Sequence, residues 1–185
     1  MPGVSLRLVD AAGDAVVGQT WGEVHVRGAN RMLGWLGERS LPNDAWFATG
    51  DIGHWDEAGR LVLVDRRRET ILRAGYTIYP SQVEEVLSQH PDVSEVVVVG
   101  RSDDYYGQVL VAVVVGPELD VQALFHFADA RLGRHERLAE ITLVDTLPMG
   151  RSGKVLKRAL VADLASGALA TIARLNDSDK DPQTE

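Results

Sequence analysis

The segment PSQVEEVLSQHPDVSEVVVVGRSDDYYGQVLVAVVV, residues 80–115, decides the fold of the second half of the chain. Its first residue is a proline, which suits the first position of a helix, and its apolar residues then recur at helical spacing. This pattern predicts a helix over 80–89. Two apolar runs rich in β-branched residues follow at 93–99 and 109–115, and such runs are typical of central strands covered on both faces.

The residues after this segment continue the alternation of strands and helices. Apolar residues between 121 and 132 fall on one helical face, and Gly133 then suits the C-cap of that helix. A further strand is expected over 141–144. A last helix is expected to begin near Gly153, with its apolar face formed by Leu156, Leu160, Val161 and Leu164.

The residues before this segment are patterned for strands alone. Apolar and polar residues alternate near 6–9 and 24–26, and Asp56-Glu57-Ala58-Gly59 forms a turn before a strand over 61–64. A second turn is expected at Asp10-Ala11-Ala12-Gly13. The fold class is therefore α+β: a β-rich, distorted barrel-like subdomain at 1–65, and a small α+β domain at 66–175 in which helices cover a short sheet. Residues 176–185 carry no apolar side chain, which predicts a disordered acidic tail.

Composition narrows the classes of function. The chain has 185 residues, of which 45% are hydrophobic and 25% charged, and its net charge is −8. An acidic chain without a long basic face is poorly suited to nucleic acid or to anionic membranes, and no apolar run approaches the ~20 residues of a membrane span. The start of the chain lacks the basic and apolar segments of a signal peptide, and there is no cysteine, so a cytoplasmic location is expected.

Several common kinds of site are excluded by spacing. Gly153-Lys154 is not part of a phosphate-binding P-loop, because Pro148 stands where that motif needs its first glycine. The five histidines have no metal-ligand spacing, and no serine lies in a G-x-S-x-G elbow. No metal site is therefore predicted in this chain.

Several polar or glycine positions have an ordinary structural interpretation, and some of them also suit a ligand site. Lys154, at the expected helix start, is either a solvated lysine or a residue that meets an anion, since the helix dipole disfavours a cation there. Asp51 suits a turn or cap as well as a ligand. Arg66, Arg67 and Arg68 suit a solvated linker or an anion site, and Gly75 suits an ordinary turn.

Taken together, these positions form an ordered set of motifs. The motifs are Trp46-Phe47-Ala48-Thr49-Gly50-Asp51, Val64-Asp65-Arg66-Arg67-Arg68-Glu69, Gly75-Tyr76-Thr77-Ile78-Tyr79-Pro80-Ser81-Gln82-Val83-Glu84-Glu85, and Leu147-Pro148 with Ser152-Gly153-Lys154-Val155. In this order they resemble the motifs of the AMP-forming adenylate ligases, the superfamily of acyl-CoA synthetases, luciferases and peptide-synthetase adenylation domains. The resemblance runs from Gly22-Glu23-Val24 to Arg158.

The resemblance implies a role for each position. Asp51 and Arg66 would contact the ribose of ATP, Arg68 would be the hinge before a mobile C-terminal lid domain, and Lys154 would be the catalytic lysine that contacts the carboxylate and the α-phosphate. Gly75 would let the pantetheine arm of CoA pass close to the backbone. The sequence departs from the family pattern at Ala48, where relatives often have a basic residue, and at Arg68, where aspartate or lysine is usual.

The implied activity belongs to a longer enzyme. The resemblance implies the C-terminal part of an acid–thiol ligase that uses ATP, CoA and a small carboxylic acid, with Mg²⁺ bound through a missing N-terminal part. It also implies a role in fatty acid metabolism. Tyr79-Pro80 after Gly75 favours a CoA ligase over an amino-acid-activating domain. Because no phosphate loop or acyl pocket is recognised, the chain alone is expected to be inactive. The alternative is a stand-alone, non-catalytic module that binds nucleotide or complements a separate N-terminal half.

Overall fold

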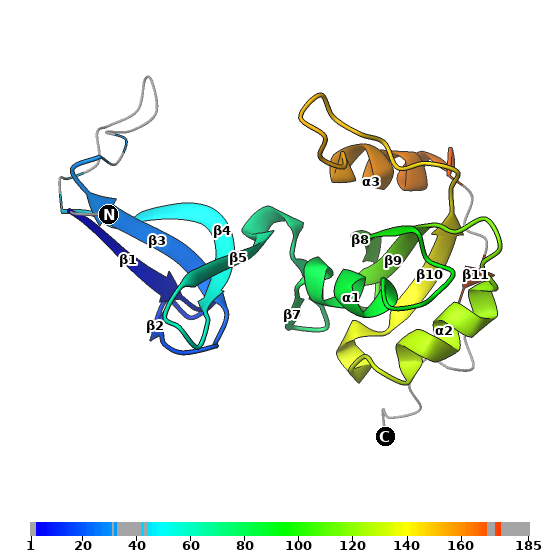
Figure 1. The fold of residues 1–185 in the computed structure, drawn as a ribbon, viewed down its shortest axis with the longest axis horizontal. Coiled ribbons are helices and arrows are strands. Elements are labelled where there is room, and N and C mark those ends of the chain that lie inside the picture. The colour runs from blue at the N-terminus through cyan, green and yellow to red at the C-terminus, as the bar shows by residue number, and fades with distance from the viewer. Residues whose placement is uncertain (1–2, 31, 33–41, 43, 170–172, 175–185) are drawn as a thin grey trace. The chain divides into compact units, whose positions relative to one another are not determined.

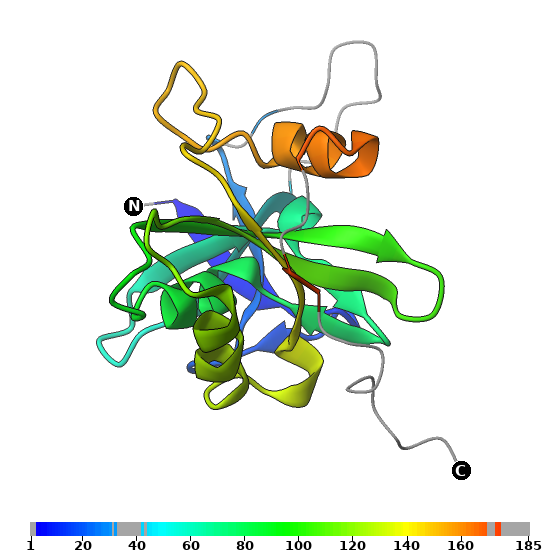
Figure 2. The same cartoon turned by 90° about the vertical axis from the view of Figure 1, so that its right-hand side faces the viewer.

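The computed structural model describes residues 3–30, 32, 42, 44–169 and 173–174. The expected tail at 176–185 lies outside them. The chain divides into two compact units, residues 1–68 and 69–185, and this division falls three residues after the boundary expected from the sequence. Each unit is described by itself (Figures 1 and 2).

The first unit is an antiparallel sheet of five strands in the order β2-β1-β3-β4-β5. The strands are β1 (Val4–Val9), β2 (Ala15–Val16), β3 (Gly22–Gly28), β4 (Phe47–Trp55) and β5 (Leu61–Arg66). The strand order is open, with β2 and β5 at its ends, so the barrel-like closure suggested by the sequence is not seen among the described residues.

Both turns expected in the first unit are present, and an aspartate organises each one. The Asp10 carboxylate accepts hydrogen bonds from the Ala12 and Asp14 amides, and that of Asp56 accepts from Ala58 and Arg60. Each turn contains a glycine at positive φ, which is +72° at Gly59. The first turn joins β1 to the short β2 rather than directly to β3.

The second unit is a mixed sheet with helices on both faces (Figure 2). A short 3₁₀ helix (Arg67–Glu69) spans the division between the units. After it come β6 (Ile71–Arg73), β7 (Tyr76–Ile78), α1 (Pro80–Leu87), β8 (Glu95–Asp103), β9 (Gly107–Val115), α2 (Val121–Asp129), a 3₁₀ turn (Arg134–Glu136), β10 (Leu138–Leu143), α3 (Lys157–Ser166) and β11 (Ala173–Arg174). Strand β9 pairs in parallel with β10 and antiparallel with β8 and β6.

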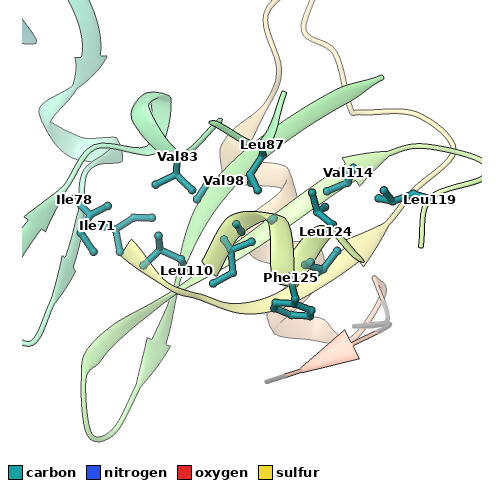
Figure 3. Close-up of a cluster of buried hydrophobic side chains, with 14 residues drawn as sticks. Ile71, Ile78, Val83, Leu87, Val98, Leu110, Val114, Leu119, Leu124 and Phe125 are labelled. Carbon is teal, nitrogen blue, oxygen red and sulfur yellow. The ribbon is translucent and has the colours of Figure 1, made fainter. Parts of the chain in front are cut away.

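Alternate residues of β8 and β9 build two separate cores, as expected for strands covered on both faces. Val98, Leu110, Ala112 and Val114 pack with α1 and α2 (Figure 3), whereas Val97, Val99, Val111 and Val113 pack with Leu160 of α3. Each fully buried valine or leucine contributes about 1.5–3 kcal/mol of hydrophobic free energy. These two strands therefore hold both helical layers on one frame.

Two helix ends differ from the sequence expectation. Helix α2 ends at Asp129, and Gly133 is not its C-cap: Gly133 has φ −68° and instead precedes the 3₁₀ turn, where its amide donates to the Glu136 carboxylate. Helix α3 begins at Lys157, not near Gly153. The residues before α3 form a hairpin-like loop, because the Leu156 amide donates to the Pro148 carbonyl and Met149 bridges to Val155.

The sequence predicted four apolar residues on the buried face of α3, and the structure places only two of them against the core. Leu160 is buried and Leu164 packs against the same core, but Leu156 and Val161 are 47% and 41% exposed. The four residues do not share one face because Leu156 lies before the helix, in the loop that delays its start.

Candidate functional site

Asp51 and Arg66 are brought together by the register of two neighbouring strands. They are directly opposite each other on β4 and β5, and Arg66 Nη1 lies 2.8 Å from Asp51 Oδ1. A one-residue shift in the pairing between Ile52 and Gly53 changes the register that the Asp56–Gly59 turn sets, and it places these residues, 15 apart in sequence, where they form an ion pair. Both side chains remain partly solvent-accessible, which leaves them able to contact a ligand.

The backbone before Asp51 is shaped by Thr49 and Gly50. The Thr49 hydroxyl donates to the Val24 carbonyl on β3 and accepts from the Asp51 amide at 3.1 Å. Gly50 has φ +76°, a conformation that favours glycine. Thr49 and Gly50 line a cavity of about 500 Å³ together with Arg66, Arg67 and Arg68. The Asp51 carboxylate pairs with Arg66, which is one of the three arginines that line this cavity, and such groups suit a ligand that has both hydroxyl and phosphate groups.

Arg68, the expected hinge residue, is the last residue of the first unit. It lies within the exposed 3₁₀ helix Arg67–Glu69. The chain therefore leaves one compact unit and enters the next at the position expected for the hinge.

Lys154 lies in the loop between β10 and α3, not at a helix start. The loop is closed by backbone hydrogen bonds: the Gly150 amide donates to the Lys154 carbonyl at 2.8 Å, and that of Gly153 donates to Gly150 at 3.0 Å. Gly153 has φ +73°. The Lys154 side chain is exposed, and no described residue forms a hydrogen bond or ion pair with its ammonium group. The loop thus presents a cation that has no partner among the described residues.

Gly75 lies in the two-residue turn that joins β6 and β7. Arg73 and Tyr76 pair across this turn, and both residues between them have positive φ, +48° at Ala74 and +85° at Gly75. Positive φ at both central residues is the pattern of a type I′ turn, whose backbone twist matches that of the two strands of a hairpin. A side chain added at Gly75 would meet no atom within 4 Å, so its outer side is open.

The Lys154 loop and the Gly75 turn lie at different places in the second unit. In Figure 1 the loop before α3, in orange, lies with α3 above the sheet, whereas β7 is an edge strand of the sheet itself. The structure therefore brings Asp51 and Arg66 together, and it separates the Lys154 loop from the Gly75 turn.

Comparison with known proteins connects these features. Residues 82–154 match the family described as AMP-binding enzyme C-terminal domain. This match makes the segment 82–154 similar to that domain. The matched segment ends at Lys154, so it includes the exposed lysine and strands β8, β9 and β10, whereas the Gly75 turn with β6 and β7 precedes it.

Relatives of the domain are CoA ligases. An indoleacetate–CoA ligase of Aromatoleum aromaticum is 39% identical over 171 residues, which is 87% of this chain and 34% of that protein. A 2-succinylbenzoate–CoA ligase of Bacillus cereus is 39% identical over 157 residues, 82% of this chain and 33% of the ligase. The chain thus spans about a third of the length of the curated relatives it matches.

Solved structures show the same fold. ATP-bound MatB from Rhodopseudomonas palustris superposes with a TM-score of 0.79 at 29% identity, over 88% of this chain and 34% of its own. The o-succinylbenzoate CoA synthetase from Bacillus subtilis, in complex with an acyl-adenylate intermediate, has a TM-score of 0.72 at 31% identity, over 86% of this chain and 34% of its own. The α+β fold class and the resemblance to adenylate ligases are confirmed.

In the first unit the acid Glu23 is buried, and the sequence does not reveal its role. Glu23 on β3 is 9% exposed and accepts a hydrogen bond from Arg67 Nη1 at 2.6 Å. His25 Nε2 lies 3.8 Å from the same carboxylate. The signal in the sequence is weak: Glu23 and His25 alternate with valines, which is the pattern of any half-exposed strand. The buried Glu23 carboxylate therefore fixes the position of Arg67, the residue after Arg66.

Two further features bear on the classes of site. Among the residues described, no group of three or more His, Cys, Asp or Glu side chains could hold a metal ion. No described helix is long and apolar enough to cross a membrane.

Proposed function

We propose that this chain forms the C-terminal part of an acyl-CoA ligase that activates a carboxylic acid with ATP and transfers the acyl group to the thiol of CoA. The observation that carries the proposal is Lys154: an exposed lysine without a described partner, on a glycine-flanked loop, at the end of the segment that matches the AMP-binding enzyme C-terminal domain. The names of the relatives support the reaction class.

In the proposed first step, Lys154 acts on charge that develops during adenylation. A carboxylate oxygen attacks the α-phosphorus of ATP, the bond to pyrophosphate breaks, and acyl-AMP forms. The Lys154 ammonium would contact the carboxylate and the α-phosphate oxygens, where negative charge accumulates. Mg²⁺ would enter with ATP, bound mainly by its phosphates.

Asp51 and Arg66 would bind the ribose of the nucleotide. Asp51 Oδ1 forms the ion pair with Arg66, and no described residue donates to Oδ2, which leaves that oxygen for a ribose hydroxyl. The three arginines of the cavity would place positive charge near the phosphates.

In the proposed second step, the domain turns about Arg68 and presents the Gly75 turn in place of Lys154. The CoA sulfur then attacks the acyl carbon, the acyl–oxygen bond breaks, and AMP leaves. The separate positions of the two segments support this order, since the Lys154 loop lies beside α3 and the Gly75 turn joins strands at the sheet edge, and a rotation of the domain that withdraws one presents the other.

The test is Lys154→Ala in the full-length ligase, with the two half-reactions measured separately. Loss of one charge-stabilising donor should slow adenylation about 100-fold to 1,000-fold, while thioester formation from preformed acyl-AMP stays within about twofold. The matched control is Arg151→Ala, which removes an exposed cation from the same loop and should leave both steps within about threefold. Equal loss of both steps in Lys154→Ala would refute the proposal.

A second test uses the 185-residue chain itself. Asp51→Asn should weaken AMP binding by about tenfold or more, measured by calorimetry, because a hydrogen bond to a charged acceptor is worth about 1.5–3 kcal/mol. Asp56→Asn, which alters the turn of the same hairpin, should leave AMP affinity unchanged. An Asp51→Asn variant that binds AMP as the parent does would exclude Asp51 from the nucleotide site.

A further inference from the structure

The turn that carries Gly75 is conformationally demanding. Two consecutive residues have positive φ, and one of them is an alanine, for which the left-handed region is unfavourable. An isolated two-stranded hairpin is only marginally stable in water. Contacts from neighbouring segments must therefore hold this turn in the shape observed.

Arg73 provides the largest of these contacts. Its Nη1 group donates to the Arg137 carbonyl at 2.7 Å and to the His135 carbonyl at 3.3 Å. The guanidinium carbon also lies 4.8 Å from the centroid of the Tyr106 ring. Burial lowers the pKa of Arg73 below its usual value, and the guanidinium group stays charged at neutral pH. The contacts of this side chain thus tie β6 to the segment before β10.

Two other contacts act on the turn from either side of Gly75. The Ala74 amide donates to the Tyr106 carbonyl at 2.8 Å, and the Tyr76 ring stacks on the His135 ring with centroids 5.0 Å apart. Arg73 touches both partners of these contacts, Tyr106 and His135. Arg73, Tyr106 and His135 therefore form one connected set of residues that fixes the conformation of the turn.

The front of the turn is open. No atom lies within 4 Å of a side chain built on Gly75, and Ala74, Gly75 and Tyr76 are all exposed. The turn is fixed by contacts on one side and exposed on the other. This arrangement suits a backbone that binds a ligand in one defined conformation. Lysine could not reproduce the Arg73 contacts, because it lacks the planar fork that donates to carbonyls while stacking on a ring.

We propose that Arg73 is a positioning residue for the thiol-transfer step, which fixes the Ala74–Gly75 turn without touching the reactants. This inference rests on the proposed function, because it assumes that the turn acts in that step. It implies that loss of the Arg73 contacts slows thioester formation from acyl-AMP and leaves adenylation nearly unchanged.

The experiment begins with Arg73→Met in the full-length ligase. Thioester formation from preformed acyl-AMP should fall at least tenfold, while adenylation stays within twofold. Arg73→Lys, which keeps the charge and one donor, should recover part of the lost rate. The matched control is Arg131→Met, since Arg131 also stacks on a ring, that of Phe127 at 3.7 Å from the ring centroid, and donates to a carbonyl, but lies just after the C-cap of α2. Arg131→Met should leave both rates unchanged.

A structural readout on the 185-residue chain separates this inference from the proposed function. Amide hydrogen exchange at Ala74 should accelerate at least tenfold in Arg73→Met and remain as in the parent in Arg131→Met. Unchanged exchange, or equal loss of both half-reactions, would overturn the positioning role. If Gly75→Leu in the parent background does not slow thioester formation, it is the proposed function of the turn that fails.

Discussion

The Gly75 turn and the Lys154 loop are built on the same domain in opposite ways. The Gly75 turn is held by side chains, since Arg73, Tyr76 and Tyr106 all contact neighbouring segments. The Lys154 loop is closed by its own backbone hydrogen bonds, and its side chains at Met149, Lys154 and Leu156 are exposed. A turn that presents backbone needs a fixed shape, whereas a loop that presents one charged side chain needs reach and freedom from competing partners.

Among the substitutions that test this contrast between the turn and the loop, the largest effect is expected at Gly75. Gly75→Leu should slow thioester formation about 100-fold, because a side chain would occupy the open front of the turn and force a left-handed leucine. Adenylation should stay within twofold, the reverse of Lys154→Ala. Rates of the two half-reactions are measured in the full-length ligase.

Gly59→Leu is the matched control for Gly75→Leu. Gly59 also lies in a hairpin turn, with φ +72° and no atom within 4 Å of an added side chain. The same backbone penalty applies there, so this variant should lose stability without a selective loss of either half-reaction. A selective effect at Gly59 would show that the result at Gly75 reports strain alone.

The second-largest effect is expected at Glu84, which contacts the first residue of the helix after the Lys154 loop. Glu84 on α1 accepts hydrogen bonds from the Val98 amide at 2.8 Å and from Lys157 Nζ at 2.9 Å, so it joins α1, β8 and the first residue of α3. Glu84→Ala should lower the free energy of unfolding by about 2 kcal/mol, because it leaves the buried Val98 amide without a partner. Chemical denaturation of the 185-residue chain measures the change.

Glu85→Ala is the control for that anchor. Glu85 is the next residue of the same helix, and it is exposed. Its removal should change the free energy of unfolding by no more than about 0.5 kcal/mol. Similar losses in the two variants would mean that helix propensity, not the contact to β8 and α3, sets the stability.

The smallest effect is expected at Ala74. Ala74→Gly should relieve the left-handed strain at φ +48° and raise the free energy of unfolding by about 0.5 kcal/mol, because the gain slightly exceeds the entropy cost of glycine. Thermal unfolding measures it. A loss of stability of more than about 1 kcal/mol would show that the Ala74 methyl packs usefully and that the turn is unstrained.

Sequence patterns predicted the local elements well where the signal was periodic. The runs at 93–99 and 109–115 became β8 and β9 with the two-sided burial expected, and both aspartate turns formed as expected. The helix ends were the weaker part. Helix α3 was expected to begin too early, because hydrogen bonds between Pro148 and Leu156 close a loop that residue spacing does not reveal.

The candidate site shows the same division. The ordered motifs were sufficient to single out Asp51, Arg66, Gly75 and Lys154, and the match to the AMP-binding enzyme C-terminal domain confirms the resemblance; the role of each residue stays a prediction. The sequence did not indicate that Glu23 anchors Arg67, or that Arg73 holds the Gly75 turn. Each of those contacts joins residues at least 44 positions apart, and only strand pairing and loop packing bring them together.

The sequence by itself determined the order of elements, the two-sided strands and the set of candidate residues, because periodicity, turn residues and motifs are local properties. Only the tertiary structure decided which of these residues meet and which remain free. The Asp51–Arg66 pair depends on strand register, and the exposure of Lys154 on a loop depends on where α3 begins. These outcomes follow from packing between distant segments, whose free energy no single stretch of sequence contains.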